Sequence, residues 1–261
     1  MEDLKKRVVC AITLLASCYC LNANAALTID RSRLVFNEGD KSVSINVANR
    51  NTQDPYLAQV WLENEQEQKI SGPLMILPPV QRIEPNGKTL VRVQALADLA
   101  SLPKDRESVY WFNLREIPPK NEKANVLTLA VQTRLKVFYR PKALAVDPSA
   151  DTVPGTETLT LTREGSQMVV NNPTPYHFTF VELRNGAKGN AIAGFDPDMV
   201  APKGTLKLNV PVSSVGNSPA LIFVNDYGSQ RLLPFTCTGN TCKAGRPENP
   251  VAAPNKPSTS H

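Results

Sequence analysis

The chain has 261 residues, of which 41% are hydrophobic and 20% are charged, with 29 Lys and Arg against 24 Asp and Glu. This length suits one large or two small domains with real cores, and the composition excludes a disordered or fibrous protein. A net charge of +5 without a basic stripe argues against nucleic-acid binding, and two histidines, His177 and His261, leave little for histidine-based catalysis or a metal centre.

Residues 1–25 have the pattern of a secretory signal peptide. A basic start at residues 5–7 precedes an apolar run at 8–16, and Ala23-Asn24-Ala25 fits the small-x-small pattern of a cleavage site. We expect cleavage before Ala26 and export to the periplasm, and the apolar run is too short to span a membrane. The alternative is a lipoprotein signal in which Cys18 is lipidated.

Residues 26–142 are expected to form an immunoglobulin-like β-sandwich. Short runs rich in β-branched and aromatic residues recur between turn signals, and many alternate apolar and polar residues, as half-buried strands do. No cysteine lies on these runs, so the sandwich would lack the inter-sheet disulfide of antibody domains. Only residues 96–102 have helical character. The expected strands are 27–29, 42–47, 57–62, 90–93, 110–114 and 126–139.

A proline-containing break after Tyr139-Arg140-Pro141 marks a domain boundary, because proline cannot donate to a sheet ladder. A second sandwich is expected over residues 147–244. Residues 245–261 lack periodicity and are expected to be a disordered tail. The expected strands of the second domain are 157–161, 168–170, 178–181, 206–210 and 221–224.

Removal of the signal peptide would leave two cysteines, Cys237 and Cys242, flanking the turn-forming residues Thr-Gly-Asn-Thr. In an oxidising compartment this pair favours a disulfide that closes a hairpin. The alternative is a redox or metal-binding pair. The spacing is not C-x-x-C, however, and no further Cys or His lies nearby in the sequence.

Two segments are specific enough to indicate a family. Residues 102–118, LPKDRESVYWFNLREIP, together with Tyr139-Arg140-Pro141, resemble the signature of periplasmic pilus-assembly chaperones of the chaperone–usher pathway. The resemblance spans roughly residues 26–243 and implies two immunoglobulin-like domains in a boomerang arrangement. It also implies a chaperone that binds, folds and caps pilus subunits and delivers them to an outer-membrane usher. Supporting matches lie at residues 28–33, 55–61, 79–82, 172–176 and 225–228.

The resemblance further implies that a chaperone strand completes a subunit sandwich that lacks its last strand, by β-strand addition. Leu127, Leu129 and Val131 match the donated positions. On this hypothesis Ala130 and the residues of its parity pack inward. The residues alone also permit the alternative that the three donated residues face the core of their own domain.

Five charged residues match two further features of the family. Arg33 and Lys136 match a pair that holds the C-terminal carboxylate of the subunit, for which a forked guanidinium and a compact ammonium are suitable donors. Taken singly, each would be a solvated surface charge. Lys136, however, lies in an apolar strand, where a buried cation needs a partner. Glu107, Arg140 and Asp226 match an interdomain salt-bridge network.

The sequence disfavours two other classes of function. A pilus subunit or adhesin is disfavoured by two complete strand sets. A secreted enzyme is disfavoured because Ser101-x-x-Lys104 lacks its companion motifs and no phosphate loop or metal cluster is present in the sequence. We therefore expect no enzymatic activity, no cofactor, no metal, no nucleic-acid partner and no membrane insertion.

The expected partners are one pilus subunit per chaperone and the usher. The short segment 116–125 resembles the short-loop subclass of the family. An exposed apolar edge strand would also permit a self-capping dimer.

Overall fold

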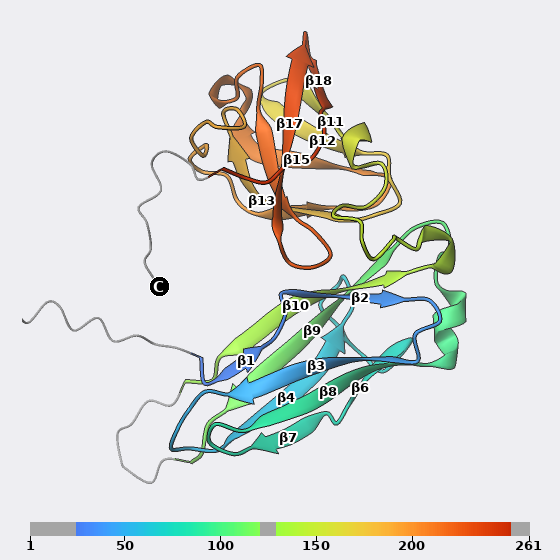
Figure 1. The fold of residues 1–261 in the computed structure, drawn as a ribbon, viewed down its shortest axis with the longest axis vertical. Coiled ribbons are helices and arrows are strands. Elements are labelled where there is room, and N and C mark those ends of the chain that lie inside the picture. Colours follow the sequence, from blue (N-terminus) through green and yellow to red (C-terminus); the bar gives the residue numbers. More distant parts are fainter. Residues whose placement is uncertain (1–24, 121–128, 252–261) are drawn as a thin grey trace, which may run out of the picture.

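The computed structural model describes residues 25–120 and 129–251, which form two β-sandwich domains (Figure 1). Strands dominate both domains, and the helices within these residues are short 3-10 turns. None of the described helices has the length and apolarity that a membrane span requires. The predicted all-β class with two sandwich domains is confirmed.

The N-terminal domain consists of two facing sheets. Its elements are β1 (Leu27–Ile29), β2 (Arg33–Asn37), β3 (Ser42–Asn49), β4 (Tyr56–Glu63), β5 (Lys69–Ile70), β6 (Leu74–Leu77), β7 (Val80–Ile83), β8 (Lys88–Ala95), the 3-10 helix η1 (Ala97–Ser101), β9 (Ser108–Ile117) and β10 (Gln132–Arg140). One sheet has the order β1-β3-β8-β6 and the other β2-β10-β9-β4-β5, with β7 also paired to β4. Residues of inward parity, such as Phe36, Ile45 and Phe112, are fully buried between the sheets.

Strand β10 begins later than the sequence predicts. The expected strand 126–139 is wrong at its start, since β10 begins at Gln132; residues 121–128 lie outside the described part of the chain. Pro118 and Pro119 follow β9 directly and cannot donate to a ladder, so pairing with β9 ends there. From Gln132 to Leu135, β10 pairs with β9 alone, because its parallel partner β2 joins only at Lys136.

The C-terminal domain is a sandwich whose strands form one continuous path. Its elements are η2 (Lys142–Leu144), η3 (Thr156–Thr158), β11 (Thr160–Glu164), β12 (Gln167–Asn172), β13 (Phe178–Arg184), β14 (Asp198–Val200), β15 (Gly204–Pro211), η4 (Val212–Ser214), β16 (Ala220–Val224), β17 (Gln230–Thr238) and β18 (Thr241–Ala244). The order is β14-β13-β16-β17-β18-β11-β12-β15. Strand β17 joins the two layers, because its first half pairs with β16 and its second half with β18, and Pro234 lies at the change of partner.

One expected strand of this domain is partly wrong. Over 157–161, the chain forms η3 before β11 begins at Thr160. Gly155 precedes η3 with a φ of 79°, a left-handed conformation that glycine adopts without steric cost, so the chain turns here before it enters the sheet. The alternation of residues 157–161 therefore does not mark a strand over its whole length.

The start of the tail is ordered, which corrects the expectation that residues 245–261 are disordered. Leu232 of β17 and Glu248 exchange both backbone hydrogen bonds, at 2.8 and 2.9 Å. Arg184 Nη1 donates to the Val251 carbonyl at 2.6 Å. The chain after β18 therefore continues along the same edge of β17, past the last β17–β18 pair at Phe235 and Ala244. Residues 252–261 lie outside the described residues.

Candidate functional site

The outer face of β2 and β10 is the surface that meets the C-terminal domain. In β2 the inward residues are Leu34 and Phe36, and in β10 they are Leu135 and Val137, all buried in the core. Since side chains alternate along a strand, residues of the other parity point away from this core. The parallel register pairs them in rows, and they are Arg33 with Lys136, Val35 with Phe138, and Asn37 with Arg140.

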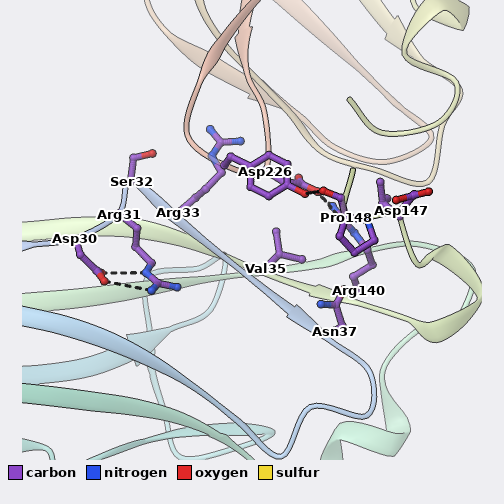
Figure 2. A pocket seen from close by; sticks show the side chains of 12 residues that line it. Asp30, Arg31, Ser32, Arg33, Val35, Asn37, Arg140, Asp147, Pro148 and Asp226 are labelled. Carbon is purple, nitrogen blue, oxygen red and sulfur yellow. Dashed lines mark hydrogen bonds and ion pairs between the residues drawn. The ribbon is translucent and has the colours of Figure 1, made fainter. Parts of the chain in front are cut away.

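Arg33 reaches from this face toward the C-terminal domain (Figure 2). Its Nη1 donates to the Val224 carbonyl at 2.6 Å, and its guanidinium lies 5.7 Å from the centre of the Phe138 ring. Its buried Nε has no hydrogen-bond partner among the described residues. Burial lowers the pKa of Arg33 to about 10, against the opposing charges of Asp226 and Glu107, so the group remains a cation at neutral pH.

Lys136 is the second cation of this row. Its Nζ lies 4.8 Å from the centre of the Trp111 ring, and no carboxylate of the described residues forms a salt bridge with it. Burial and then the charge of Arg33 lower the pKa of Lys136, while the charge of Asp198 acts in the opposite direction. The two cations therefore repel each other in a partly desolvated place, and an anion bound between them would relieve both penalties.

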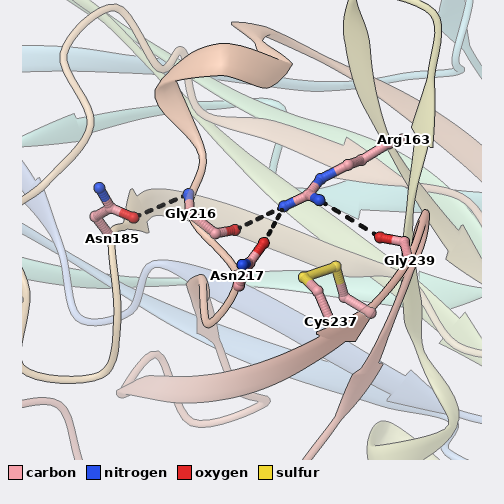
Figure 3. Close-up of a disulfide and its surroundings, with 7 residues drawn as sticks. Arg163, Asn185, Gly216, Asn217, Cys237 and Gly239 are labelled. Carbon is pink, nitrogen blue, oxygen red and sulfur yellow. Dashed lines mark hydrogen bonds between the residues drawn. A yellow bond between two sulfur atoms is a disulfide. The ribbon is translucent and has the colours of Figure 1, made fainter.

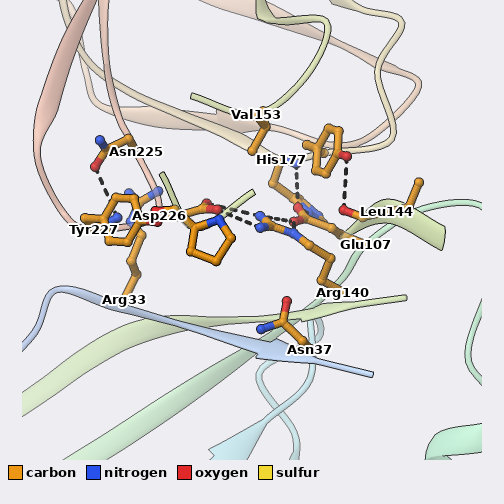
Figure 4. Close-up of polar contacts among 12 residues, drawn as sticks. Arg33, Asn37, Glu107, Arg140, Leu144, Val153, His177, Asn225, Asp226 and Tyr227 are labelled. Carbon is orange, nitrogen blue, oxygen red and sulfur yellow. Dashed lines mark hydrogen bonds and ion pairs between the residues drawn. The ribbon is translucent and has the colours of Figure 1, made fainter. Parts of the chain in front are cut away.

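Arg140, Glu107 and Asp226 meet where the two domains join (Figure 4). Arg140 Nη2 lies 2.8 Å from Glu107 Oε1, and Arg140 Nη1 lies 2.6 Å from Asp226 Oδ2. Arg140 is the last residue of β10 and Glu107 directly precedes β9, whereas Asp226 lies in the turn between β16 and β17. The structure thus brings the three predicted residues together as a bridge between domains.

His177 is a member of this network that the sequence analysis missed. The Glu107 Oε2 atom accepts the His177 backbone N–H at 2.8 Å and lies 3.1 Å from the ring Nδ1, while the ring packs 5.2 Å from that of Phe138. Burial by itself raises the pKa of Glu107, but hydrogen bonds from His177 and the charge of Arg140 outweigh it and hold that pKa below its usual value. Nothing in the local sequence links two residues 70 positions apart.

The segment before β10 presents apolar side chains to solvent. Leu129 is 70% exposed and Val131 is 43% exposed, so neither faces the core of its own domain, whereas Leu127 lies outside the described residues. Both share the parity of Leu135, so the inward-facing apolar series of β10 continues past the end of its own sandwich. Ala130 is also exposed, so the expectation that it packs inward is wrong, whereas the other residues of its parity, Val126 and Thr128, lie outside the described residues.

Cys237 and Cys242 form the predicted disulfide (Figure 3). They are cross-strand partners in β17 and β18, on either side of the Thr-Gly-Asn-Thr turn. Beside this hairpin Arg163 Nη2 donates to the Asn217 side chain at 2.9 Å, which ties the neighbouring loop to β11. The disulfide therefore links β17 to β18 across their hairpin, on strands that contribute no residue to the interdomain ion pairs.

Fold and site together define a two-domain β-sandwich binding protein. It has a pair of cations on β2 and β10 between its domains, and an exposed apolar segment directly before β10. A family model for the PapD N-terminal domain, described as a pili and flagellar-assembly chaperone, matches residues 26–145. The model for the C-terminal domain of the pili assembly chaperone PapD matches residues 154–234. The chain therefore belongs to the family of pilus-assembly chaperones.

Individual relatives agree with this assignment. The chain is 47% identical over 232 residues to the probable fimbrial chaperone YfcS of Escherichia coli K12, covering 89% of this chain and 91% of the relative. It is 42% identical over 221 residues to the chaperone protein PapD of Escherichia coli, covering 84% and 90%. The crystal structure of the periplasmic chaperone SfaE matches with a TM-score of 0.63 and 30% identity, covering 78% of this chain and 95% of that one. The protein is a chaperone of fimbrial subunits, and its family acts by donor-strand complementation.

Proposed function

We propose that the row formed by Arg33 and Lys136 binds the C-terminal carboxylate of a pilus subunit, while Leu127, Leu129 and Val131 complete the sandwich of that subunit. The observation that carries the proposal is the pairing of two cations in one register row, on the strand whose preceding residues expose an apolar series. The apolar residues and Lys136 would then act from one stretch of chain, and β2 would add Arg33 beside Lys136.

The electrostatics support a carboxylate as the ligand. The buried Nε of Arg33 has no partner among the described residues, and burial disfavours the charged form of Lys136. A carboxylate between them would accept hydrogen bonds from both and replace a repulsion by two attractions. Charge-assisted hydrogen bonds of this kind contribute about 1.5–3 kcal/mol each.

The proposed role of Leu129 and Val131 follows from the geometry of an extended strand. In an extended segment Leu129 and Val131 lie on one side, about 6.5–7 Å apart along the chain, which suits two successive pockets of a subunit groove. The backbone groups on one edge of β10 lack a β2 partner before Lys136, so they offer a ladder to an added strand. Burial of the exposed side chains then supplies apolar contact while the backbone fixes the register.

A peptide-binding experiment separates the carboxylate from the rest of the ligand. The probe is a synthetic peptide with the C-terminal sequence of a pilus subunit, prepared as the free acid and as the amide. We expect Arg33→Ala and Lys136→Met each to lose about tenfold or more in affinity for the acid, with little change for the amide. Substitution to Ala of the exposed Arg92 and Lys207 serves as the matched control. A variant that keeps the full preference for the acid would refute the role of that cation.

The remaining partners and the location are part of the same proposal. The mature chain would start at Ala26 in the periplasm, bind one subunit at a time, and pass it to an outer-membrane usher. Without a subunit, the exposed Leu129 and Val131 would favour a self-capping dimer, since an open apolar edge pairs readily. Intact mass and light scattering of the secreted chain test the start point and the dimer: a start other than Ala26, or a strict monomer at high concentration, contradicts the respective statement.

The short-loop subclass remains a proposal of the same kind. Strand β9 extends to Ile117 and so includes the first residues of the segment 116–125, which shortens the connection before the apolar series further. Assembly of a rod-like rather than a thin, fibre-like pilus in the native host would support the subclass.

A further inference from the structure

Glu116 is a buried carboxylate on the core-facing side of β9. It shares the inward parity of Phe112 and Leu114 and is only 6% exposed. Its Oε2 accepts the backbone N–H of Leu27 at 2.8 Å, and within residues 25–120 and 129–251 no Lys, Arg or His side chain forms a salt bridge with it. A buried carboxylate normally has a cationic partner, because removing its charge from water is costly.

The start of β1 is held directly beside this carboxylate. The Ala26 carbonyl accepts the Arg50 backbone N–H at 2.7 Å, and the next peptide N–H is the one that Glu116 binds. The Ala26 nitrogen is therefore three covalent bonds from a nitrogen already in contact with the carboxylate. A hollow of about 310 Å³ adjoins this point, and its lining includes Ala26, Arg50, Tyr56, Glu116, Leu129 and Val131.

We propose that the α-ammonium group created at Ala26 by signal-peptide removal forms a buried ion pair with Glu116. This inference rests on the proposed start of the mature chain at Ala26. In the precursor the same nitrogen is a neutral amide, so Glu116 there has only a hydrogen-bonded partner. Hydrolysis of the peptide bond between Ala25 and Ala26 consumes one water molecule and leaves a carboxylate on the leaving signal peptide and the ammonium on the chaperone.

The pair would connect processing with the donor segment. The Glu116 backbone N–H donates to the Val131 carbonyl at 3.0 Å, so the residue that holds the new N-terminus also holds the point from which the donor segment departs. Glu116 is thus a positioning residue: its side chain fixes β1 and its backbone fixes Val131. The precursor would have a less firmly held donor segment than the mature chaperone.

Among the described residues that line the hollow, no other cation binds Glu116, so the Ala26 ammonium is its expected partner. Arg50 also lines the hollow, but its Nε donates to Thr28 Oγ1 at 3.2 Å rather than to the carboxylate. Tyr56 of β4 is the other titratable group there, and the side contributed by Leu129 and Val131 is apolar. An apolar wall beside the carboxylate strengthens its attraction for a cation, because the local dielectric is low.

The first test measures the titration of the α-amine in the mature protein. Reductive methylation of the amine with ¹³C-formaldehyde keeps its positive charge and gives an NMR signal whose pH dependence reports its pKa. We expect that pKa to be at least about one unit higher in the mature chain than in Glu116→Gln, which is a tenfold difference in proton affinity. As a second reference that keeps Glu116, a chain with one serine inserted before Ala26 displaces the amine by one residue. Equal pKa values in all three chains would overturn the proposal.

The second test asks whether the two groups act as one unit. The serine insertion and Glu116→Gln are combined in a double-mutant cycle, read out by thermal unfolding and by capture of a subunit. We expect each change alone to lower both the unfolding temperature and the capture of a subunit. Once Glu116 is replaced, the insertion should have no further effect on either. Substitution of the exposed Glu164 by Gln is the matched control for loss of one negative charge. Fully additive effects would overturn the ion pair.

The outcomes separate this inference from the proposal on which it rests. A secreted chain whose mass shows a start other than Ala26 contradicts the proposed cleavage site and with it the pair. A start at Ala26 with an ordinary amine pKa leaves the chaperone proposal intact and refutes the pair alone.

Discussion

Replacement of Leu129 by Ala separates the donor hypothesis from ordinary core packing. Full burial of a leucine side chain contributes about 1.5–3 kcal/mol. Leu129 is 70% exposed in the free chain, so most of that amount, about 1–2 kcal/mol, remains to be gained when a subunit covers it. The variant should therefore lose about 5–30-fold in affinity for a subunit. Its free energy of unfolding should change by less than about 0.5 kcal/mol, as at other exposed sites.

Leu135 is the matched control, because it lies in β10 with the same parity as Leu129 but is only 4% exposed. Leu135→Ala should lower the free energy of unfolding by about 2–5 kcal/mol. Both variants are measured by denaturant unfolding of the free chaperone and by titration with a subunit, using a non-fibrillating subunit to obtain an affinity. If Leu129→Ala unfolds as easily as Leu135→Ala, or binds the subunit as tightly as the parent chain, the reasoning is refuted.

Two further predictions concern the interdomain network and the tail. Glu107→Gln should lower stability by about 3 kcal/mol at neutral pH, since it leaves buried partners of a hydrogen-bonded ion pair unsatisfied. Folding lowers the pKa of Glu107 below its ordinary value of 4.5, so its contribution is complete above that pH and is lost as the pH falls through the folded pKa. Calorimetry should therefore find that the difference from the parent chain shrinks as the pH falls below 4.5. A difference that grows with acid would contradict the assignment. Deletion of all residues after Ala244 removes the two backbone bonds between Leu232 and Glu248 and should destabilise the C-terminal domain by about 1–3 kcal/mol in the same measurement, whereas an unchanged transition would mean that the tail contributes nothing.

Alternation of apolar and polar residues was sufficient to predict most central strands, because both neighbours of such a strand are in place and one face is buried. It failed where pairing ends. The odd-numbered series from Leu129 into β10 is apolar except at Thr133, yet the ladder begins only at Gln132. Periodicity reports which face a residue occupies, not whether a neighbouring strand is present to pair with it.

The edge strand β2 was missed for a related reason. Its sequence, Arg33-Leu-Val-Phe-Asn37, places a cation at its start and buries residues of both parities, so it lacks the pattern of a half-buried strand. Its parallel register with β10 depends on a partner about one hundred residues away in sequence. The family resemblance located Arg33 and Lys136, but only the structure places them in one row.

Contacts that depend on three-dimensional proximity had no local signal at all. His177 meets Glu107 across the domain boundary, and Glu116 meets the start of β1 across 89 positions. In the sequence, Glu116 is the first residue of the expected connecting segment 116–125. Its one recognisable signal is its parity, since it continues the inward series of Phe112 and Leu114 and so places a carboxylate where an apolar residue is expected.

The arrangement along β10 explains why one strand can serve the subunit, the cleft and the domain interface without conflict. Leu135 and Val137 face the core, and the same parity continues into the exposed Leu129 and Val131. The other parity carries Lys136 and Arg140, which face the C-terminal domain. Because the period of a strand is two, the insertion of one residue before Lys136 would turn the apolar series onto the opposite face relative to the cations. The register of β10, rather than any single contact, therefore fixes the position of Leu129 and Val131 relative to the proposed carboxylate site at Lys136.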